Sequence, residues 1–333
     1  MKPLIDSYGR RISYLRISIT DRCNFRCRYC MPEGGIDWLP HDKIMRYEEY
    51  LRILGICISR GVEKVRITGG EPLVRKGLTA FVGDAKRIVG LRELSLTTNG
   101  VLLATMADGL KKAGLDRVNI SLDTLNKERF FFITRVDAYD KTIEGIMAAL
   151  KYGFSPVKIN VVAIRGFNDD EISAFADLTL DNPIEVRFIE LMPMGCACRY
   201  GDHEVISSPE IRQIIEDHYG ELEPLEYKHG PAKVFRINGG KGKIGLIGAM
   251  SEHSFCSTCN RIRITANGQL RPCLFSDDHI DLLTPMRKGI SDAELEILIE
   301  DGVRMKQRAH GMCLGKYTHL NQGCEAFMNT IGG

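Results

Sequence analysis

The feature that most constrains this chain is a group of three closely spaced cysteines near its amino terminus, Cys23, Cys27 and Cys30. They directly follow a β-branched run that is typical of a strand, so one short loop can turn all three thiolates toward a single metal centre. Random placement of 11 cysteines in 333 residues would produce this spacing about 0.01 times. A four-iron cluster normally takes four cysteines, so three leave one iron open for chemistry.

Two further roles for this triad remain open. The cysteines can belong to a zinc knuckle, or they can be reduced thiols of the hydrophobic core. A structural zinc site closes its shell with four ligands, usually near one another in the sequence. We therefore favour an iron-sulfur cluster with an open iron.

The spacing, with the aromatic Tyr29 directly before the last cysteine, resembles the loop of the radical S-adenosylmethionine superfamily. The resemblance implies that the open iron chelates the amino and carboxylate groups of S-adenosylmethionine. It also implies that one electron from the cluster cleaves the sulfonium to a 5'-deoxyadenosyl radical. Such an enzyme needs an external one-electron reductant.

From Tyr14 to Glu190, strand-like runs alternate with segments long enough to form helices. Repeated right-handed crossovers predict an α/β fold with an incomplete parallel barrel of six βα units, residues 1–195, followed by a smaller domain, residues 196–333. One helix is expected over Tyr47–Arg60 and another over Ile172–Leu180, the second with its N-cap at Asn168–Asp170. The six expected strands are Leu15–Thr20, Lys64–Thr68, Glu93–Thr98, Arg117–Leu122, Val157–Ile164 and Ile184–Glu190.

Ligands of such folds lie at the carboxyl ends of the strands, and polar or glycine residues follow several of these runs. The second run ends in Gly69, Gly70 and Glu71, where paired glycines allow a close backbone approach and the carboxylate can accept from an amino group. Thr97 and Ser121 supply hydroxyls at the ends of the third and fourth runs, and Met192 follows the sixth.

Cations interrupt the otherwise apolar runs. Since strand residues alternate, some of these cations point into the barrel, where an unpaired charge is costly. Several cations that converge on one cavity would bind a polyanion such as a triphosphate. The cations in question are Arg16, Lys64, Arg66, Lys158 and Arg187.

A second cysteine triad lies in the carboxyl-terminal part of the chain, Cys256, Cys259 and Cys273. Between its members, a hairpin over Arg261–Thr265 and Gln269–Arg271 is expected to fold Cys273 back beside Cys259. This arrangement predicts a second cluster with an open iron. A zinc ribbon completed by His253 or His279 is the alternative.

Two open triads, together with Arg261, Arg263 and a terminal Gly-Gly, make the sequence resemble the GTP 3',8-cyclase family of molybdenum cofactor biosynthesis over nearly its whole length. The resemblance implies two [4Fe-4S] clusters and S-adenosylmethionine as cofactors. It also implies a lyase in which the 5'-deoxyadenosyl radical abstracts the ribose 3' hydrogen of GTP. The resulting carbon radical then attacks guanine C8, and the product passes to the cyclic pyranopterin monophosphate synthase.

The same resemblance implies roles for individual residues. Tyr29, Gly69, Gly70, Glu71, Ser121 and Met192 match contacts to S-adenosylmethionine, and Arg16, Arg66, Thr97 and Lys158 match contacts to GTP. Arg261, Ile262 and Arg263 match the basic segment beside the second cluster, and Gly332 and Gly333 match a tail that reaches into the active site. Phe130–Phe132 is unusually apolar for a segment after a strand, and Cys196, Cys198, Cys313 and Cys324 are additional thiols without an assigned role.

Three further classes of protein remain as alternatives: a peptide-modifying radical enzyme with an auxiliary cluster, a non-catalytic two-cluster electron carrier, and a zinc-binding RNA module. The net charge of +2 gives no global field for nucleic acid or an anionic membrane. The amino terminus has no signal-like apolar stretch, and cysteines in metal-like groups suit a reducing compartment. We therefore expect a cytoplasmic protein, monomeric or homodimeric, without nucleic-acid or membrane partners.

Overall fold

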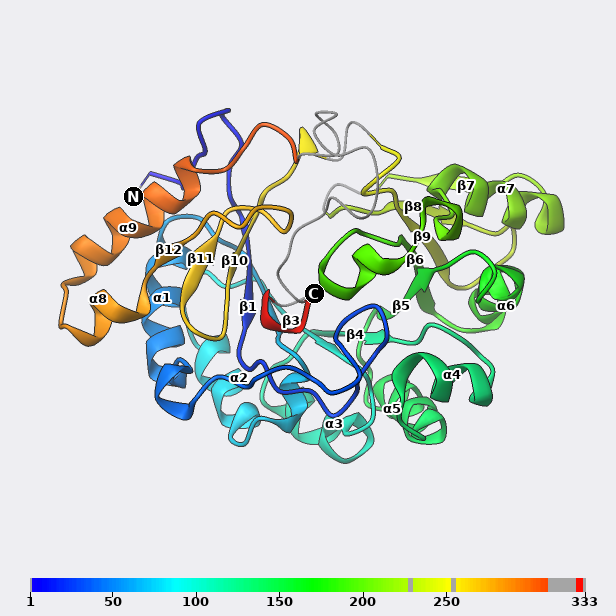
Figure 1. Cartoon of the computed structure of the whole chain (residues 1–333), viewed down its shortest axis with the longest axis horizontal. Coiled ribbons are helices and arrows are strands. Elements are labelled where there is room, and N and C mark those ends of the chain that lie inside the picture. Colours follow the sequence, from blue (N-terminus) through cyan, green and yellow to red (C-terminus); the bar gives the residue numbers. More distant parts are fainter. Residues whose placement is uncertain (1, 227–229, 253–255, 311–327, 332–333) are drawn as a thin grey trace.

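The fold is built on a single curved β-sheet with helices along its outer side (Figure 1). The computed structural model describes residues 2–226, 230–252, 256–310 and 328–331. Twelve strands follow one another across the sheet in the order β12-β11-β10-β1-β2-β3-β4-β5-β6-β9-β8-β7. The middle of this order runs in sequence, as expected for successive crossovers of one hand.

The first six strands are β1 (Tyr14–Ser18), β2 (Lys64–Thr68), β3 (Glu93–Thr98), β4 (Arg117–Ser121), β5 (Val157–Ala163) and β6 (Ile184–Glu190). The helices that connect them are α1 (Tyr47–Ser59), α2 (Leu78–Lys86), α3 (Leu103–Lys112), α4 (Lys127–Thr134), α5 (Tyr139–Lys151) and α6 (Ile172–Asp181). Neighbouring strands of this set pair in parallel. The predicted incomplete barrel of six βα units is confirmed.

The later part of the chain adds strands to both edges of the same sheet. It contains α7 (Ser208–Tyr219), β7 (Glu223–Leu225), β8 (Lys233–Arg236), β9 (Lys243–Ile247), β10 (Arg261–Ile264), β11 (Gln269–Arg271), β12 (Ile280–Asp281), α8 (Leu283–Arg287), α9 (Asp292–Arg304) and α10 (Met328–Ile331). β9 pairs in parallel with β6, whereas β10 pairs in parallel with β1. The predicted hairpin β10–β11 is present, and β8 and β9 form another antiparallel pair. A domain division near residue 195 stays a prediction.

Alternation along each strand separates the core from the interior of the barrel. On β1, Leu15 and Ile17 are fully buried in the main hydrophobic core, which also takes in the apolar faces of α1 and α2. The intervening Arg16 lines an internal cavity instead. The sheet therefore presents an apolar face to the helices and a polar, charged face to the enclosed space.

Helix α6 begins at Ile172, as expected, but its predicted N-cap at Asn168–Asp170 is wrong. A short 3-10 turn, η3 (Asp169–Glu171), precedes α6, and the Asn168 side chain caps neither element. The Asn168 amide instead donates to the carbonyl oxygens of Asp123 and Val162 and accepts from the Ile164 amide. It bridges the ends of β4 and β5 because buried backbone groups there need partners.

None of the helices in the described part of the chain combines the length and the apolar character that a membrane crossing requires.

The pairing of β10 with β1 can be tested through its buried side chains. Ile264 on β10 is fully buried beside its register partner Ile17. We expect Ile264→Ala to lower the free energy of unfolding by about 2–5 kcal/mol, because it leaves a cavity in the core. Urea denaturation measures this change. Ile297→Ala on α9, where the side chain is 58% exposed, is the matched control, and equal losses in both variants would contradict the assignment.

Candidate functional site

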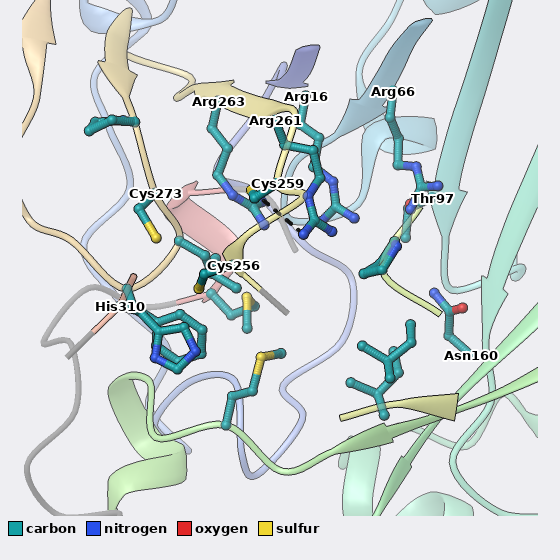
Figure 2. Close-up of a pocket in the computed structure, with 18 of the residues that line it drawn as sticks. Arg16, Arg66, Thr97, Asn160, Cys256, Cys259, Arg261, Arg263, Cys273 and His310 are labelled. Carbon is teal, nitrogen blue, oxygen red and sulfur yellow. Dashed lines mark hydrogen bonds between the residues drawn. The ribbon is translucent and has the colours of Figure 1, made fainter. Parts of the chain in front are cut away.

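Two neighbouring cavities of the barrel share part of their lining. The first, here the loop cavity, is lined by Cys23, Cys27 and Cys30. The second, here the arginine cavity, is lined by Cys256, Cys259 and Cys273 and is drawn in Figure 2. Both are lined by Thr97, Asn160, Ile189, Met192 and Met328. The two triads predicted from the sequence therefore line two neighbouring cavities, one triad in each.

The first cysteine loop is held against the turn that follows β2. The Gly70 amide donates to the Thr20 carbonyl at 2.7 Å, and the Glu71 amide donates to the Arg22 carbonyl at 2.8 Å. A Cβ atom at Gly70 would lie 2.4 Å from the Arg22 carbonyl oxygen, and one at Gly69 would lie 2.6 Å from that of Thr20. The glycines thus permit a close approach between two segments of the chain, in addition to lining the cavity.

The Glu71 carboxylate is buried in the wall of the loop cavity. It accepts from the Thr98 hydroxyl at 2.8 Å and from the amides of Asn99 and Leu73 at 2.7 and 3.0 Å. Burial raises the pKa of Glu71 to about 7 despite these bonds. The carboxylate therefore fixes the ends of β2 and β3 relative to each other as well as facing the cavity.

Also in the lining of the loop cavity, the Tyr29 hydroxyl donates to Asp123 at 2.7 Å, and Asp123 accepts from the Val162 amide as well. Burial raises the pKa of Asp123 to about 6. Ser121 and Met192 line the same cavity. All six predicted S-adenosylmethionine contacts, Tyr29, Gly69, Gly70, Glu71, Ser121 and Met192, thus lie around the loop cavity.

The register of the sheet creates a row of arginines in the second cavity. Arg263 on β10, Arg16 on β1 and Arg66 on β2 are direct register partners on three adjacent strands. Arg261 and Arg187 also line the cavity, and Figure 2 labels Arg263, Arg261, Arg16 and Arg66 among its lining residues. Sequence alternation predicted the inward direction, and the pairing of β10 with β1 brings the two carboxyl-terminal arginines to the others.

Crowding makes these arginines easier to deprotonate than usual. Burial and the neighbouring Arg263 lower the pKa of Arg16 to about 9, and burial lowers that of Arg66 to about 9. Burial and Arg261 lower the pKa of Arg263 to about 10. The cavity is therefore strongly cationic and would be stabilised by a bound polyanion.

Several buried polar atoms on this wall have no hydrogen-bond partner within the described residues: Arg16 Nε, Thr97 Oγ1 and Asn160 Oδ1. Such groups are costly when unsatisfied, so they indicate a place for polar ligand atoms. Asn160 was not predicted from the sequence. An amide inside an apolar strand gives the only signal, and alternation alone does not say that it meets a ligand.

Two predicted substrate contacts turn out to be paired within the protein. Lys158 lies fully buried with its Nζ 2.5 Å from Glu185, which also accepts from Arg187 Nε. Burial lowers the pKa of Lys158. Burial alone would raise the pKa of Glu185, but the neighbouring Arg187 and Lys158 outweigh this effect, and the pKa of Glu185 is lowered. Lys64 lies at the first residue of β2, 3.5 Å from Glu93. Neither lysine lines the cavities described here, because each neighbouring strand supplies an inward carboxylate.

The remaining predicted residues either lie away from the arginine cavity or fall outside the described residues. Ile262 lies between Arg261 and Arg263 in the sequence. Its side chain is 1% exposed and packs in the main core, so it faces away from the arginine cavity. His279 is exposed and contacts the Asp277 carbonyl, whereas His310, which was not predicted, lines the arginine cavity. Gly332, Gly333, His253, Cys313 and Cys324 lie outside the described residues.

The second triad lies in a cationic setting. Burial raises the pKa of Cys259, but Arg261 and Lys306 more than offset this and bring it to about 6. Arg261 Nη2 lies 3.7 Å from Cys259 Sγ, the dashed contact in Figure 2. Lys306, also not predicted, lines the cavity and donates to the carbonyls of Arg261 and Pro272. In contrast, burial raises the pKa of Cys23 to about 11.

Thiolates are the ligands that iron-sulfur clusters prefer, and both triads present cysteine sulfurs to an internal space. Within the described residues, no three Cys, His, Asp or Glu side chains are grouped to hold a single metal ion. The thiolates of a four-iron cluster bind different irons, so these cysteines need not converge on one ion. The donor set, three cysteines that line each cavity, is of the kind that binds iron-sulfur clusters.

The fold and the first loop define a radical S-adenosylmethionine enzyme, and comparisons with known proteins agree. The chain matches the model of the radical SAM superfamily over residues 17–179 and that of Molybdenum Cofactor Synthesis C over residues 184–312. It is similar in fold to Streptococcus suis SuiB bound to S-adenosylmethionine (TM-score 0.60, 15% identity, 90% of this chain and 69% of that one). It is also similar to anSMEcpe with bound AdoMet (TM-score 0.59, 14% identity, 93% and 85%).

Curated relatives identify the branch. The chain is 48% identical to the GTP 3',8-cyclase of Heliobacterium modesticaldum over 93% of its own length and 95% of that protein. It is 44% identical to the GTP 3',8-cyclase of Alkaliphilus oremlandii over 98% and 99% of the two chains. The chain belongs to the GTP 3',8-cyclase family.

The packing of Gly70 against the cysteine loop leads to a prediction about cluster retention. We expect Gly70→Ala to lose iron, because the added Cβ meets backbone rather than a flexible side chain. Iron and sulfide analysis of anaerobically purified protein measures this loss. Gly34→Ala is the matched control, since nothing lies within 4 Å of its Cβ position. Full iron content in Gly70→Ala would show that the contact is dispensable.

Proposed function

We propose that this protein catalyses the GTP 3',8-cyclase reaction of molybdenum cofactor biosynthesis with one cofactor centre at each end of its internal space. The observation that carries the proposal is the shared part of the lining of the two cavities, with a cysteine triad on either side and arginines clustered at one end. Residues 1–195 would supply the S-adenosylmethionine end, and residues 196–333 the second triad.

At the first end, Cys23, Cys27 and Cys30 would hold a [4Fe-4S] cluster. With S-adenosylmethionine and one electron from an external reductant, this centre supplies a 5'-deoxyadenosyl radical. The chain's own residues would hold the methionine and adenosine parts. The turn at Gly69–Glu71 would face the amino group, and Tyr29, Ser121 and Met192, which line the same cavity, would contact the rest of the molecule.

At the second end, Cys256, Cys259 and Cys273 would hold another [4Fe-4S] cluster, and its open iron would face the guanine. Arg16, Arg66 and Arg187 surround the space where a triphosphate would lie, and charge-assisted bonds to phosphate are strong. This cation group favours GTP over the peptide substrate of the alternative hypothesis. A terminal tail with Gly332 and Gly333 near the active site remains part of the proposal.

Between the two ends, Thr97 and Asn160 line both cavities, each with a side-chain oxygen that has no hydrogen-bond partner among the described residues. They would orient the ribose so that its 3' hydrogen faces the radical and its 3' carbon lies near guanine C8. Positioning of this kind converts an improbable encounter into an efficient intramolecular step. Arg261 and Arg263 would stabilise charge on the purine as the new bond forms.

Removal of the second triad tests the two-centre arrangement. We expect the triple variant Cys256→Ser, Cys259→Ser, Cys273→Ser to fall from about eight to about four iron atoms per chain. It should lose GTP turnover but still cleave S-adenosylmethionine with dithionite. Cys198→Ser, outside both triads, should retain both activities. GTP turnover at the normal rate in the triple variant would contradict the proposal.

The arginine row gives a second test, of phosphate binding. We expect Arg66→Gln to weaken GTP binding about ten- to hundredfold, because charge-assisted hydrogen bonds contribute about 1.5–3 kcal/mol. Isothermal titration calorimetry measures the affinity. Guanosine, which lacks phosphates, should bind both proteins equally, and Lys141→Gln on the surface of α5 should leave both affinities unchanged. An equal loss for guanosine would show that Arg66 does not act on the phosphates.

A further inference from the structure

Arg10 lies in a tight amino-terminal turn and connects this turn to the second cysteine triad. The turn closes through an antiparallel bridge between Ile5 and Arg11. Inside it, the Asp6 carboxylate accepts from the backbone amides of Tyr8 and Arg10, both at 2.9 Å. The turn therefore holds a carboxylate directly beside the Arg10 side chain.

The Arg10 guanidinium forms four hydrogen bonds with described residues, three of them to carbonyl oxygens far along the chain. Its Nε donates to Asp6 at 2.5 Å, and the two side chains are 10% and 0% exposed. Nη1 donates to the carbonyls of Cys256 and Arg308, at 2.8 and 3.0 Å, and Nη2 donates to that of Gln307 at 2.6 Å. Figure 1 shows the amino-terminal segment beside the chain that follows α9. Asp6 thus fixes one edge of the guanidinium, and the other edge joins two separate segments.

The bond to Cys256 acts on a residue of the second triad. The Cys256 carbonyl also accepts from the Cys259 amide at 3.1 Å, so one oxygen atom links two cysteines of the triad. Further along this loop, the Asn260 carbonyl accepts from the Ser13 amide at 3.2 Å, where β10 begins to pair with β1. The sheet therefore holds the loop next to Cys259, and Arg10 holds it at Cys256.

The segment after α9 connects Arg10 to the third cysteine as well. Lys306 Nζ donates to the carbonyls of Arg261 and Pro272, at 2.9 and 2.7 Å. Pro272 directly precedes Cys273. The two residues that follow Lys306 supply the other carbonyls that Arg10 binds. Arg10 and Lys306 therefore hold the backbone of the triad at both of its ends.

These contacts require the shape of an arginine side chain. A guanidinium presents five N–H donors in a fixed planar fork, whereas a lysine ammonium is a single point with three donors. Groups that orient metal ligands typically change metal affinity about 10–100-fold when they are mutated. Since the bound carbonyl and the thiol belong to the same residue, a shift of the Cys256 backbone also moves its sulfur.

We propose that Arg10 is a positioning residue for the second cluster and holds Cys256 where its thiolate can bind iron. The proposal rests on the proposed function, which assigns a cluster to this triad. Arg10 is not among the described residues that line either cavity. It therefore acts through the backbone of a cluster ligand and not by contact with the substrate.

The test uses Arg10→Lys, which keeps a positive charge beside Asp6 but cannot reach all three carbonyls. The change is made in the triple variant Cys23→Ser, Cys27→Ser, Cys30→Ser, so that all bound iron belongs to the second site. After anaerobic reconstitution with iron and sulfide, we expect the iron content to fall from about four atoms per chain to about one or fewer. The electron paramagnetic resonance signal of the reduced protein should fall in proportion. In the chain whose second triad is replaced by serine, Arg10→Lys should leave about four iron atoms.

Arg11→Lys is the matched control, because the Arg11 side chain is 55% exposed and pairs with Glu63 at 3.1 Å. It should not change the iron content of either chain. With both triads intact, Arg10→Lys should still cleave S-adenosylmethionine with dithionite at the rate of the unsubstituted protein, which a general folding defect would prevent.

Two results would overturn the proposal: full iron content at the second site of Arg10→Lys, or an equal loss of iron from the first site. A different result bears on the proposed function. If the unsubstituted protein bound only about four iron atoms with both triads intact, the second cluster itself would be refuted.

Discussion

The parallel pairing of β10 with β1 is the interaction on which the rest of the site depends. It joins the two parts of the chain into one sheet and sets Arg263 beside Arg16, whose other neighbour is Arg66. Cys259 lies just before β10 and Cys273 just after β11, so the same pairing positions the second triad. The distance between the two triads is thus determined by the width of a barrel and not by a flexible linker.

The same pairing imposes an electrostatic cost. Inward arginines from β1, β2, β6 and β10 share one cavity, and burial with mutual repulsion lowers the pKa of Arg16, Arg66 and Arg263. Glu185 offsets part of this charge, through Lys158 and Arg187. A polyanionic ligand would offset more, and anything that binds only the native state stabilises it. Substrate binding and fold stability are therefore coupled in this protein.

The sequence predicted the features that depend on local patterns. Cysteine spacing located both triads, the repeated strand and helix segments predicted the barrel, and alternation along the strands predicted inward cations. It did not predict contacts that depend on the neighbouring strand. The pattern indicated Lys64 and Lys158 as substrate-binding cations, which stays a prediction, but it did not indicate that Glu93 and Glu185 pair with them across the sheet. It indicated Asn168 as a helix cap, yet this residue bridges β4 and β5. The addition of strands to both sheet edges, and the position of Asn160, likewise needed three-dimensional information.

The central claim is that one internal space brings the radical made at the first triad to the ribose of a nucleotide held at the second. GTP deuterated at the 3' position tests this most directly, in an anaerobic reaction with S-adenosylmethionine and dithionite followed by mass spectrometry. We expect the deuterium to be transferred to 5'-deoxyadenosine. Unlabelled 5'-deoxyadenosine, formed while the nucleotide keeps its deuterium, would contradict the claim.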